Sequence, residues 1–108
     1  MMHEYKATID RIIDGDTIDL IVDLGFHIKI KIRGRLKGVD TPERGHPEWN
    51  HATEVCRGLL QGVQADTGKE YIIIKTTKTG KYGRWIVEID GVTDELAKRW
   101  PYGNWPVL

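Results

Sequence analysis

The sequence predicts an α+β domain that is mainly β, with five strands, one long helix and one short helix. Two changes of pattern carry this prediction. Apolar and polar residues alternate with a period of two over residues 5–39, and the apolar spacing becomes three and four over residues 48–66. Strand-like segments then return. At 108 residues, the whole chain, 1–108, is expected to form one domain with a modest core.

Three strands are predicted in the N-terminal part of the chain. The first covers residues 5–13 and ends at Asp14-Gly15, a strong turn signal. The second covers residues 16–24, with a turn at 23–25. The third covers residues 26–39, with apolar residues on one face and cations on the other. The cations on that face are Lys29, Lys31, Arg33, Arg35 and Lys37. This basic face is either a solvated outer surface or a track for a phosphate backbone, and the pattern does not separate the two.

The second half of the chain supplies a helix, two strands and a short helix. A polar loop, 40–48, leads into a helix over residues 48–66, and Gly68 is expected to end it. The apolar stripe of this helix contains Trp49, Ala52, Cys56, Leu59, Leu60 and Val63. Strands are expected at 70–77 and 82–90, a short helix at 93–100, and an irregular tail at 101–108. This element order is that of the OB-fold, a five-stranded Greek-key barrel that often binds nucleic acid across its second and third strands.

The charge balance argues against a general polyanion binder. Sixteen basic and sixteen acidic residues give a formal net charge of zero, so any contact with nucleic acid must come from a local basic surface. The single cysteine excludes an internal disulfide. The first ten residues lack the apolar core of a signal peptide, and no apolar run is long enough to cross a membrane. The simplest expected location is the cytoplasm, although a chain cut from a longer secreted precursor would look the same.

The third strand runs directly into a turn that carries two carboxylates, Asp40 and Glu43. Pro42 fixes its own φ and favours an extended conformation for Thr41, so both carboxylates are held near a strand end. Carboxylates beside arginines indicate either a structural ion-pair cluster or a site for a cation and a phosphate. From residue types taken by themselves, the structural interpretation is favoured.

Common metal and phosphate motifs do not fit the spacings. A calcium loop beginning at Asp14 would need an oxygen ligand at residue 18 and glycine at residue 19, where the chain has Ile and Asp. A phosphate loop ending in Gly80-Lys81 would need an earlier glycine and a following Ser or Thr, and both are missing. His46, His51 and Cys56 are spaced by five, which turns each about 140° from the last on a helix, so zinc is not expected.

Three segments together resemble the staphylococcal nuclease (thermonuclease) family, especially its short bacterial and phage-type members. They are Ile13-Asp14-Gly15-Asp16-Thr17-Ile18, the segment from Arg35 to Glu43 (RLKGVDTPE), and Lys81-Tyr82-Gly83-Arg84. All three occur in the family's order with compatible gaps. The resemblance covers roughly residues 5–100, and the middle segment is its most specific part. The family's fold is an OB barrel with added helices, in agreement with the element order.

The resemblance implies a calcium-dependent phosphodiesterase that acts on DNA and RNA, and a monomer is expected. Carried over residue by residue, it makes Asp16 and Asp40 metal carboxylates, with Thr41 lending its backbone carbonyl. Glu43 would orient or deprotonate the attacking water. The remaining roles fall on arginines that bind the phosphate, Arg35 and Arg84, and on substrate-binding residues, Tyr82, Lys81 and Lys37. Ca²⁺ prefers such oxygen ligands, and an arginine fork matches two phosphate oxygens.

Two other classes of function remain open at this stage. A nucleic-acid-binding module without catalysis would have no need of Asp16, Asp40 and Glu43 facing a polyanion. A partner-binding barrel would use the same charges as a surface network. The family's later nucleotide-contacting tyrosines have no aligned counterpart, so Trp100, Tyr102 and Trp105 are candidates either for base stacking or for ordinary packing.

Overall fold

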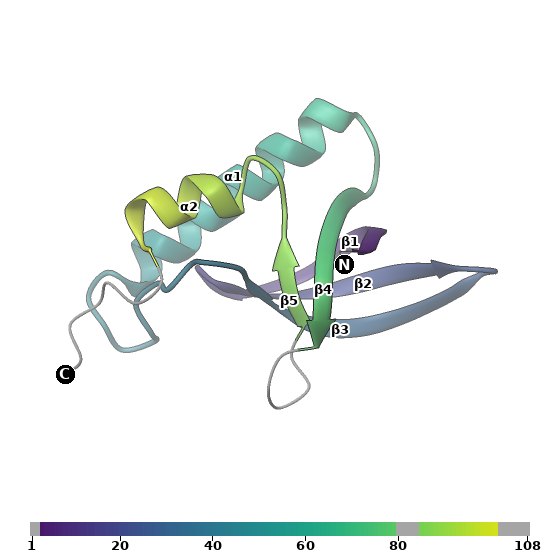
Figure 1. Ribbon diagram of the computed structural model, residues 1–108. Coiled ribbons are helices and arrows are strands. Elements are labelled where there is room, and N and C mark those ends of the chain that lie inside the picture. The colour runs from purple at the N-terminus through teal and green to yellow at the C-terminus, as the bar shows by residue number, and fades with distance from the viewer. Residues whose placement is uncertain (1–2, 80–84, 102–108) are drawn as a thin grey trace.

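The chain forms a closed five-stranded barrel with two helices, and the prediction of an OB-type α+β fold is confirmed (Figure 1). The computed structural model describes residues 3–79 and 85–101, except for the side chains of 77–79. The barrel order is β1-β2-β3-β5-β4, in which β3 and β5 pair in parallel and the other neighbours are antiparallel. The elements are β1 (His3–Asp14), β2 (Thr17–Gly25), β3 (Ile28–Leu36), α1 (Trp49–Thr67), β4 (Ile72–Thr79), β5 (Trp85–Glu88) and α2 (Thr93–Arg99).

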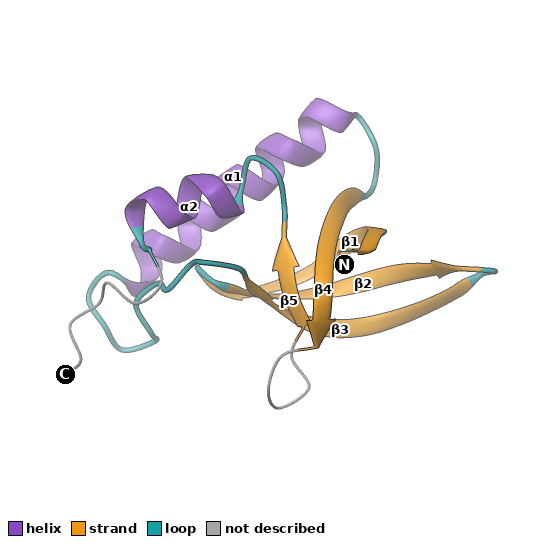
Figure 2. Cartoon of the chain, in the orientation of Figure 1, coloured by secondary structure: helices purple, strands orange, loops and turns teal. Residues whose placement is uncertain are grey.

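Both helices lie on the same side of the barrel, whereas the β2–β3 hairpin extends away from them (Figure 2). Helix α1 ends as predicted at Gly68, whose φ of 64° is left-handed and whose N–H donates to the carbonyls of Gln64 and Ala65. Cys56 lies in the core, as expected, and burial raises the pKa of its thiol to about 12. The fully buried apolar residues come from every strand and both helices, so a single core holds the barrel and helices together.

Strand β1 departs from simple alternation because it contains two bulges. The register moves from Ile9 opposite Leu20 to Arg11 opposite Asp19, which leaves Asp10 as an extra residue. A second shift leaves Ile13 extra before the turn. Each bulge reverses the face that the following side chains occupy. As a result Ile9 and Ile12 both pack against the core, although they are three positions apart, a spacing that would put them on opposite faces of a regular strand.

The end of β3 and the turn before it differ from the sequence-based boundaries. The strand ends at Leu36, three residues before the predicted end, because Gly38 takes a positive φ of 75° and turns the chain. Val39 then forms an isolated bridge with Pro101, and the N–H of Asp40 donates to the carbonyl of Trp100. The acidic turn is therefore held against the segment that follows α2, instead of extending from the sheet.

The β2–β3 turn lies at Phe26-His27, later than the 23–25 turn predicted from the sequence. Both residues have positive φ values, 53° and 62°, and Gly25 and Ile28 pair on either side of them. Such a two-residue turn normally contains Asn or Gly. The turn is predicted too early because Phe and His, unlike Asn and Gly, do not indicate a left-handed turn. The alternation of apolar and polar residues also continues through these two positions. The side chain of Phe26 is 94% exposed at the hairpin tip.

We expect His27→Gly to raise the free energy of unfolding by about 1 kcal/mol. Glycine adopts the left-handed conformation without the steric cost that a side chain incurs, roughly 1–2 kcal/mol, and part of this gain is lost to the greater freedom of the unfolded chain. Urea unfolding would measure the change. His3→Gly, in an extended strand, is the control and should not stabilise the protein. Equal or lower stability of the His27 variant would contradict the prediction.

Candidate functional site

Asp16 is the centre of the candidate site. It lies in the β1–β2 turn and is only 4% exposed. Its Oδ1 accepts a hydrogen bond from the Thr17 hydroxyl at 2.9 Å, and its Oδ2 accepts from the backbone N–H of Thr41 at 3.1 Å. The backbone carbonyl of Asp16 accepts from Leu36 N–H. These bonds fix the carboxylate at the point where the end of β3, the β1–β2 turn and the acidic loop (residues 40–48) meet.

Arg35 joins this carboxylate to the acidic loop. One guanidinium nitrogen, Nη1, lies 3.1 Å from Asp16 Oδ2. The other, Nη2, donates to the Val39 carbonyl at 3.2 Å and lies 3.7 Å from Asp40 Oδ1. The Arg35 side chain is 24% exposed. The structure thus brings together Asp16, Arg35 and Asp40, three of the residues selected from the sequence.

Close packing of Gly15 against Thr41 determines the position of the acidic loop. A Cβ atom on Gly15 would lie 2.7 Å from Thr41 Cγ2 and 2.9 Å from its Oγ1, both shorter than real contacts allow. Thr41 is 4% exposed, and its buried hydroxyl has no hydrogen-bond partner among the described residues. The glycine of the Asp14-Gly15-Asp16 turn is therefore required for the loop to approach Asp16.

Glu43 and Lys37 are exposed in the chain segments on either side of Asp40. Glu43 follows Thr41 on the exposed loop, and its carbonyl accepts from His46 N–H. Within residues 3–79 and 85–101, its carboxylate makes no hydrogen bond or ion pair, which leaves it accessible to solvent. Lys37 is exposed in the turn after β3, and its backbone N–H donates to Val87. The predicted roles of Arg84, Tyr82 and Lys81 fall outside the described residues.

The oxygen set suits a hard cation but is small. In the described part of the chain, no three His, Cys, Asp or Glu side chains gather as metal ligands. The carboxylates of Asp16 and Asp40 both pair with the same cation, the guanidinium of Arg35. Calcium takes six to eight oxygens, so these carboxylates and the carbonyl of Thr41 would leave positions for water and substrate. A Ca²⁺ ion at this position would therefore need further oxygens from water or substrate.

The basic face of β3 is largely neutralised by neighbouring strands. Arg33 Nε lies 2.9 Å from Asp19 Oδ1, with a second bond to Oδ2 at 3.2 Å, and this guanidinium lowers the pKa of Asp19. Lys31 Nζ lies 3.0 Å from Asp10 Oδ2. Arg35 pairs with Asp16. Four of the five cations, Lys29, Lys31, Arg33 and Arg35, alternate along β3, and Lys37 lies in the turn after it. Three of these four form ion pairs, so β3 is not a continuous track of unpaired positive charge.

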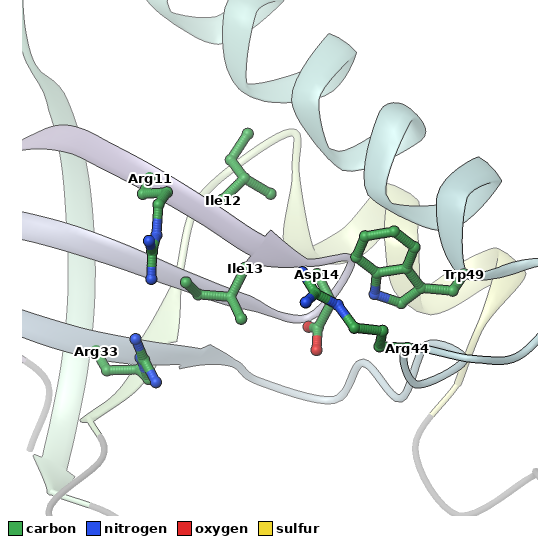
Figure 3. A pocket seen from close by; sticks show the side chains of 7 residues that line it. All are labelled: Arg11, Ile12, Ile13, Asp14, Arg33, Arg44 and Trp49. Carbon is green, nitrogen blue, oxygen red and sulfur yellow. The ribbon is translucent and has the colours of Figure 1, made fainter.

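A cleft lies beside the Asp16 site, and the sequence analysis did not identify it. Its volume is about 360 Å³, and Asp14 lies within it (Figure 3). Asp14 connects the cleft to the site, because its Oδ1 accepts the Asp16 N–H at 3.2 Å. The residues that line it are Arg11, Ile12, Ile13, Asp14, Arg33, Arg44 and Trp49. Trp49 had been predicted only as part of the apolar stripe of α1. The first bulge of β1 and the loop after Thr41 bring these distant positions together, and no local pattern signals that arrangement.

Asp14 has a raised pKa, about 7 against an ordinary 3.8. Burial is the main cause, because it disfavours the charged form, and the nearby Asp16 raises the pKa further through a side-chain hydrogen bond and charge repulsion. The folded protein therefore binds a proton at Asp14 between about pH 4 and pH 7 that the unfolded chain has lost. The contribution of Asp14 to stability consequently falls as pH rises through this window.

We expect Asp14→Asn to remove this part of the pH dependence in the metal-free protein. The free energy of unfolding of the wild type, measured with denaturant in EDTA, should decline relative to the variant from about pH 4 to pH 7. Because the variant lacks the titrating group, its free energy of unfolding should change less over this pH range. Asp66→Asn, at an exposed position near the end of α1, is the matched control and should follow the wild type. Parallel curves for the wild type and Asp14→Asn would contradict the prediction.

Comparison with curated proteins finds similarity to Protein ParB of Escherichia coli. The two sequences are 32% identical over 98 residues, which is 91% of this chain and 48% of that protein. The chain therefore spans about half the length of the relative it matches. No family model matches the sequence. Within the described residues, no helix has both the length and the apolar character needed to cross a membrane.

Proposed function

We propose that this protein is a calcium-dependent nuclease that hydrolyses phosphodiester bonds of DNA and RNA, in the manner of the staphylococcal nuclease family. The observation that carries the proposal is the convergence of Asp16, Arg35 and Asp40 at one end of the barrel. A carboxylate that is 4% exposed and has an arginine between it and a second carboxylate is a costly arrangement for a surface network. It is a useful one for binding a cation and a phosphate together.

A role is proposed for each residue of this set. Asp16 and Asp40, with the carbonyl of Thr41, would hold Ca²⁺, which neutralises charge on the phosphate oxygens when bound. Arg35 presents a planar fork of N–H donors to the same oxygens. Glu43 is exposed on the adjoining loop, where its carboxylate can accept a proton from the attacking water. Arg84 is proposed as the second phosphate ligand, with Tyr82, Lys81 and Lys37 toward the nucleotide, on the resemblance of the sequence.

Cleavage of a supercoiled plasmid in Ca²⁺, compared with EDTA, tests the proposal. Nicked and linear products in Ca²⁺ only would support the enzyme, and Asp40→Asn should abolish them. A mobility shift that weakens with salt, without cleavage, would replace the nuclease by a non-catalytic nucleic-acid-binding barrel. If neither cleavage nor a mobility shift is observed, the charges form only a structural network. A single-stranded RNA substrate in parallel tests the breadth of the activity.

We also expect calcium and a terminal phosphate to bind cooperatively. The few protein oxygens form an incomplete shell, so Ca²⁺ should bind weakly until a nucleotide supplies further oxygens. Linkage then requires each ligand to tighten the other. Thermal melts of the protein should shift slightly with Ca²⁺ or with a nucleoside bisphosphate, and by more than the sum with both. A hundredfold excess of ligand over Kd stabilises by about 2.7 kcal/mol.

The excess shift should depend on the metal carboxylate. Asp40→Asn should remove most of it, because the amide lacks the charge that attracts the cation. Asp90→Asn, at a highly exposed carboxylate that pairs with Lys75, is the control and should retain the excess. Additive shifts in the wild type, or an unchanged excess in Asp40→Asn, would show that cation and phosphate do not meet at this site.

A further inference from the structure

We infer that the cleft between β1, β3 and the start of α1 is a second nucleotide subsite, which binds the strand of nucleic acid that passes through the Asp16 site. The inference rests on the proposed function and names a further point of contact with its substrate. The ligand is one nucleotide unit, with a phosphate for the arginines and a base for the tryptophan. Asp14 joins the cleft to Asp16 through one hydrogen bond, so the two sites adjoin.

The charge in the cleft favours a phosphate. Three arginines line it, Arg11 from β1, Arg33 from β3 and Arg44 from the acidic loop (Figure 3). Arg33 is paired with Asp19, whereas Arg11 and Arg44 form no ion pair with any described residue. These two exposed guanidinium groups supply an excess of positive charge in a chain whose formal net charge is zero. Arginine binds phosphate through two parallel N–H donors, and such charge-assisted bonds are among the strongest in proteins.

The tryptophan supplies a second and independent feature. Trp49 begins α1, and its buried indole Nε1–H has no hydrogen-bond partner within the described residues. A buried donor without a partner is unfavourable, and a hydrogen bond to a ligand acceptor would remove that cost. The guanidinium of Arg44 lies over the indole, 5.0 Å from the ring centroid. A planar cation and an aromatic ring are the two surfaces on which proteins stack nucleic-acid bases.

The size and position of the cleft fit one unit of a polymer. A volume of about 360 Å³ lies within the range of ligand pockets, roughly 300–1,000 Å³. A nucleotide here would be covalently continuous with a phosphodiester at Asp16. Binding energy from this unit would hold the substrate in register without touching the reacting atoms. The contact should therefore improve binding of an oligonucleotide and leave the chemistry of a very short substrate unchanged.

The test uses the intact chain and compares Arg11→Ala/Arg44→Ala with Arg57→Ala/Lys98→Ala. The second pair removes two cations on the outer surfaces of the helices, where each pairs with a glutamate of the same helix. Binding of a labelled single-stranded oligothymidylate is measured in EDTA by anisotropy across a salt series. The cleft pair should raise Kd about tenfold or more and lower the salt slope by about 1.4, the value for two phosphate contacts. The control pair should leave the salt slope unchanged and should keep Kd within about twofold of the wild-type value.

Cleavage separates this inference from the proposed function. With Ca²⁺, the cleft pair should raise KM for the oligonucleotide about tenfold while kcat stays near wild type, and kcat/KM for bis(p-nitrophenyl) phosphate should not change. Trp49→Phe replaces the indole with a smaller aromatic ring and removes the N–H donor, and should weaken oligonucleotide binding with little loss of thermal stability. If the wild type binds through the cleft but cleaves nothing, the nuclease proposal fails and the subsite stands. Equal Kd values for the cleft and control pairs, with both folded by circular dichroism, would overturn the subsite.

Discussion

Glu43→Gln should lower the rate of phosphodiester hydrolysis by about two orders of magnitude or more, the scale expected when a general base is lost. The exchange is nearly isosteric and removes only the ability to accept a proton. Glu43 is exposed on the loop that follows Thr41, and its carboxylate forms no hydrogen bond or ion pair with any other described side chain. The fold should therefore be unaffected, and the melting temperature should stay near that of the wild type.

Single-turnover cleavage of an oligonucleotide with saturating Ca²⁺ measures this effect on the chemical step. Glu48→Gln is the matched control, because Glu48 lies on the same loop, is also exposed and precedes α1. It should cleave at the wild-type rate. A Glu43→Gln rate within about threefold of the wild type would remove Glu43 from the mechanism, since general-base catalysis contributes far more than this.

Arg35→Lys should lower cleavage by roughly two to three orders of magnitude even though the charge is conserved. The guanidinium reaches three separate acceptors, on Asp16, Val39 and Asp40, at 3.1, 3.2 and 3.7 Å. An ammonium group cannot reproduce this fork, nor present two parallel donors to a phosphate. Losing one such transition-state contact costs about 3–4 kcal/mol. The same exchange should therefore have a larger effect on kcat than a simple loss of charge at a distant position.

Arg57→Lys provides the control for this exchange. Arg57 is exposed on α1 and pairs only with Glu54 among the described residues, one turn away. Its replacement should leave cleavage unchanged. Lys29→Ala, which removes an exposed cation from β3, should alter binding and its salt dependence more than the rate. If Arg35→Lys behaves like Lys29→Ala, Arg35 belongs to the binding surface and not to the catalytic site.

The position of the acidic turn could be read from the sequence, although the means of holding it could not. Pro42 and Gly15 indicate turns because of their backbone preferences, which are local properties. The hydrogen bonds from Thr41 N–H to Asp16 and from Asp40 N–H to the Trp100 carbonyl join segments far apart in the chain. The hairpin tip at Phe26-His27 was missed because its positive φ values are imposed by the pairing of its strands and not signalled by residue type.

The sequence by itself determined the barrel, its element order and the face on which the cations of β3 lie. These follow from periods of two and of three to four, which depend only on neighbouring residues. The tertiary structure decided how those cations are used. The register between β2 and β3 places Arg33 opposite Asp19. A bulge at Asp10 shifts the register of β1 just before Arg11, which lines the cleft. The meeting of Arg11, Arg44 and Trp49 likewise depends on strand pairing and loop closure, because only the folded chain brings residues so distant in sequence within contact.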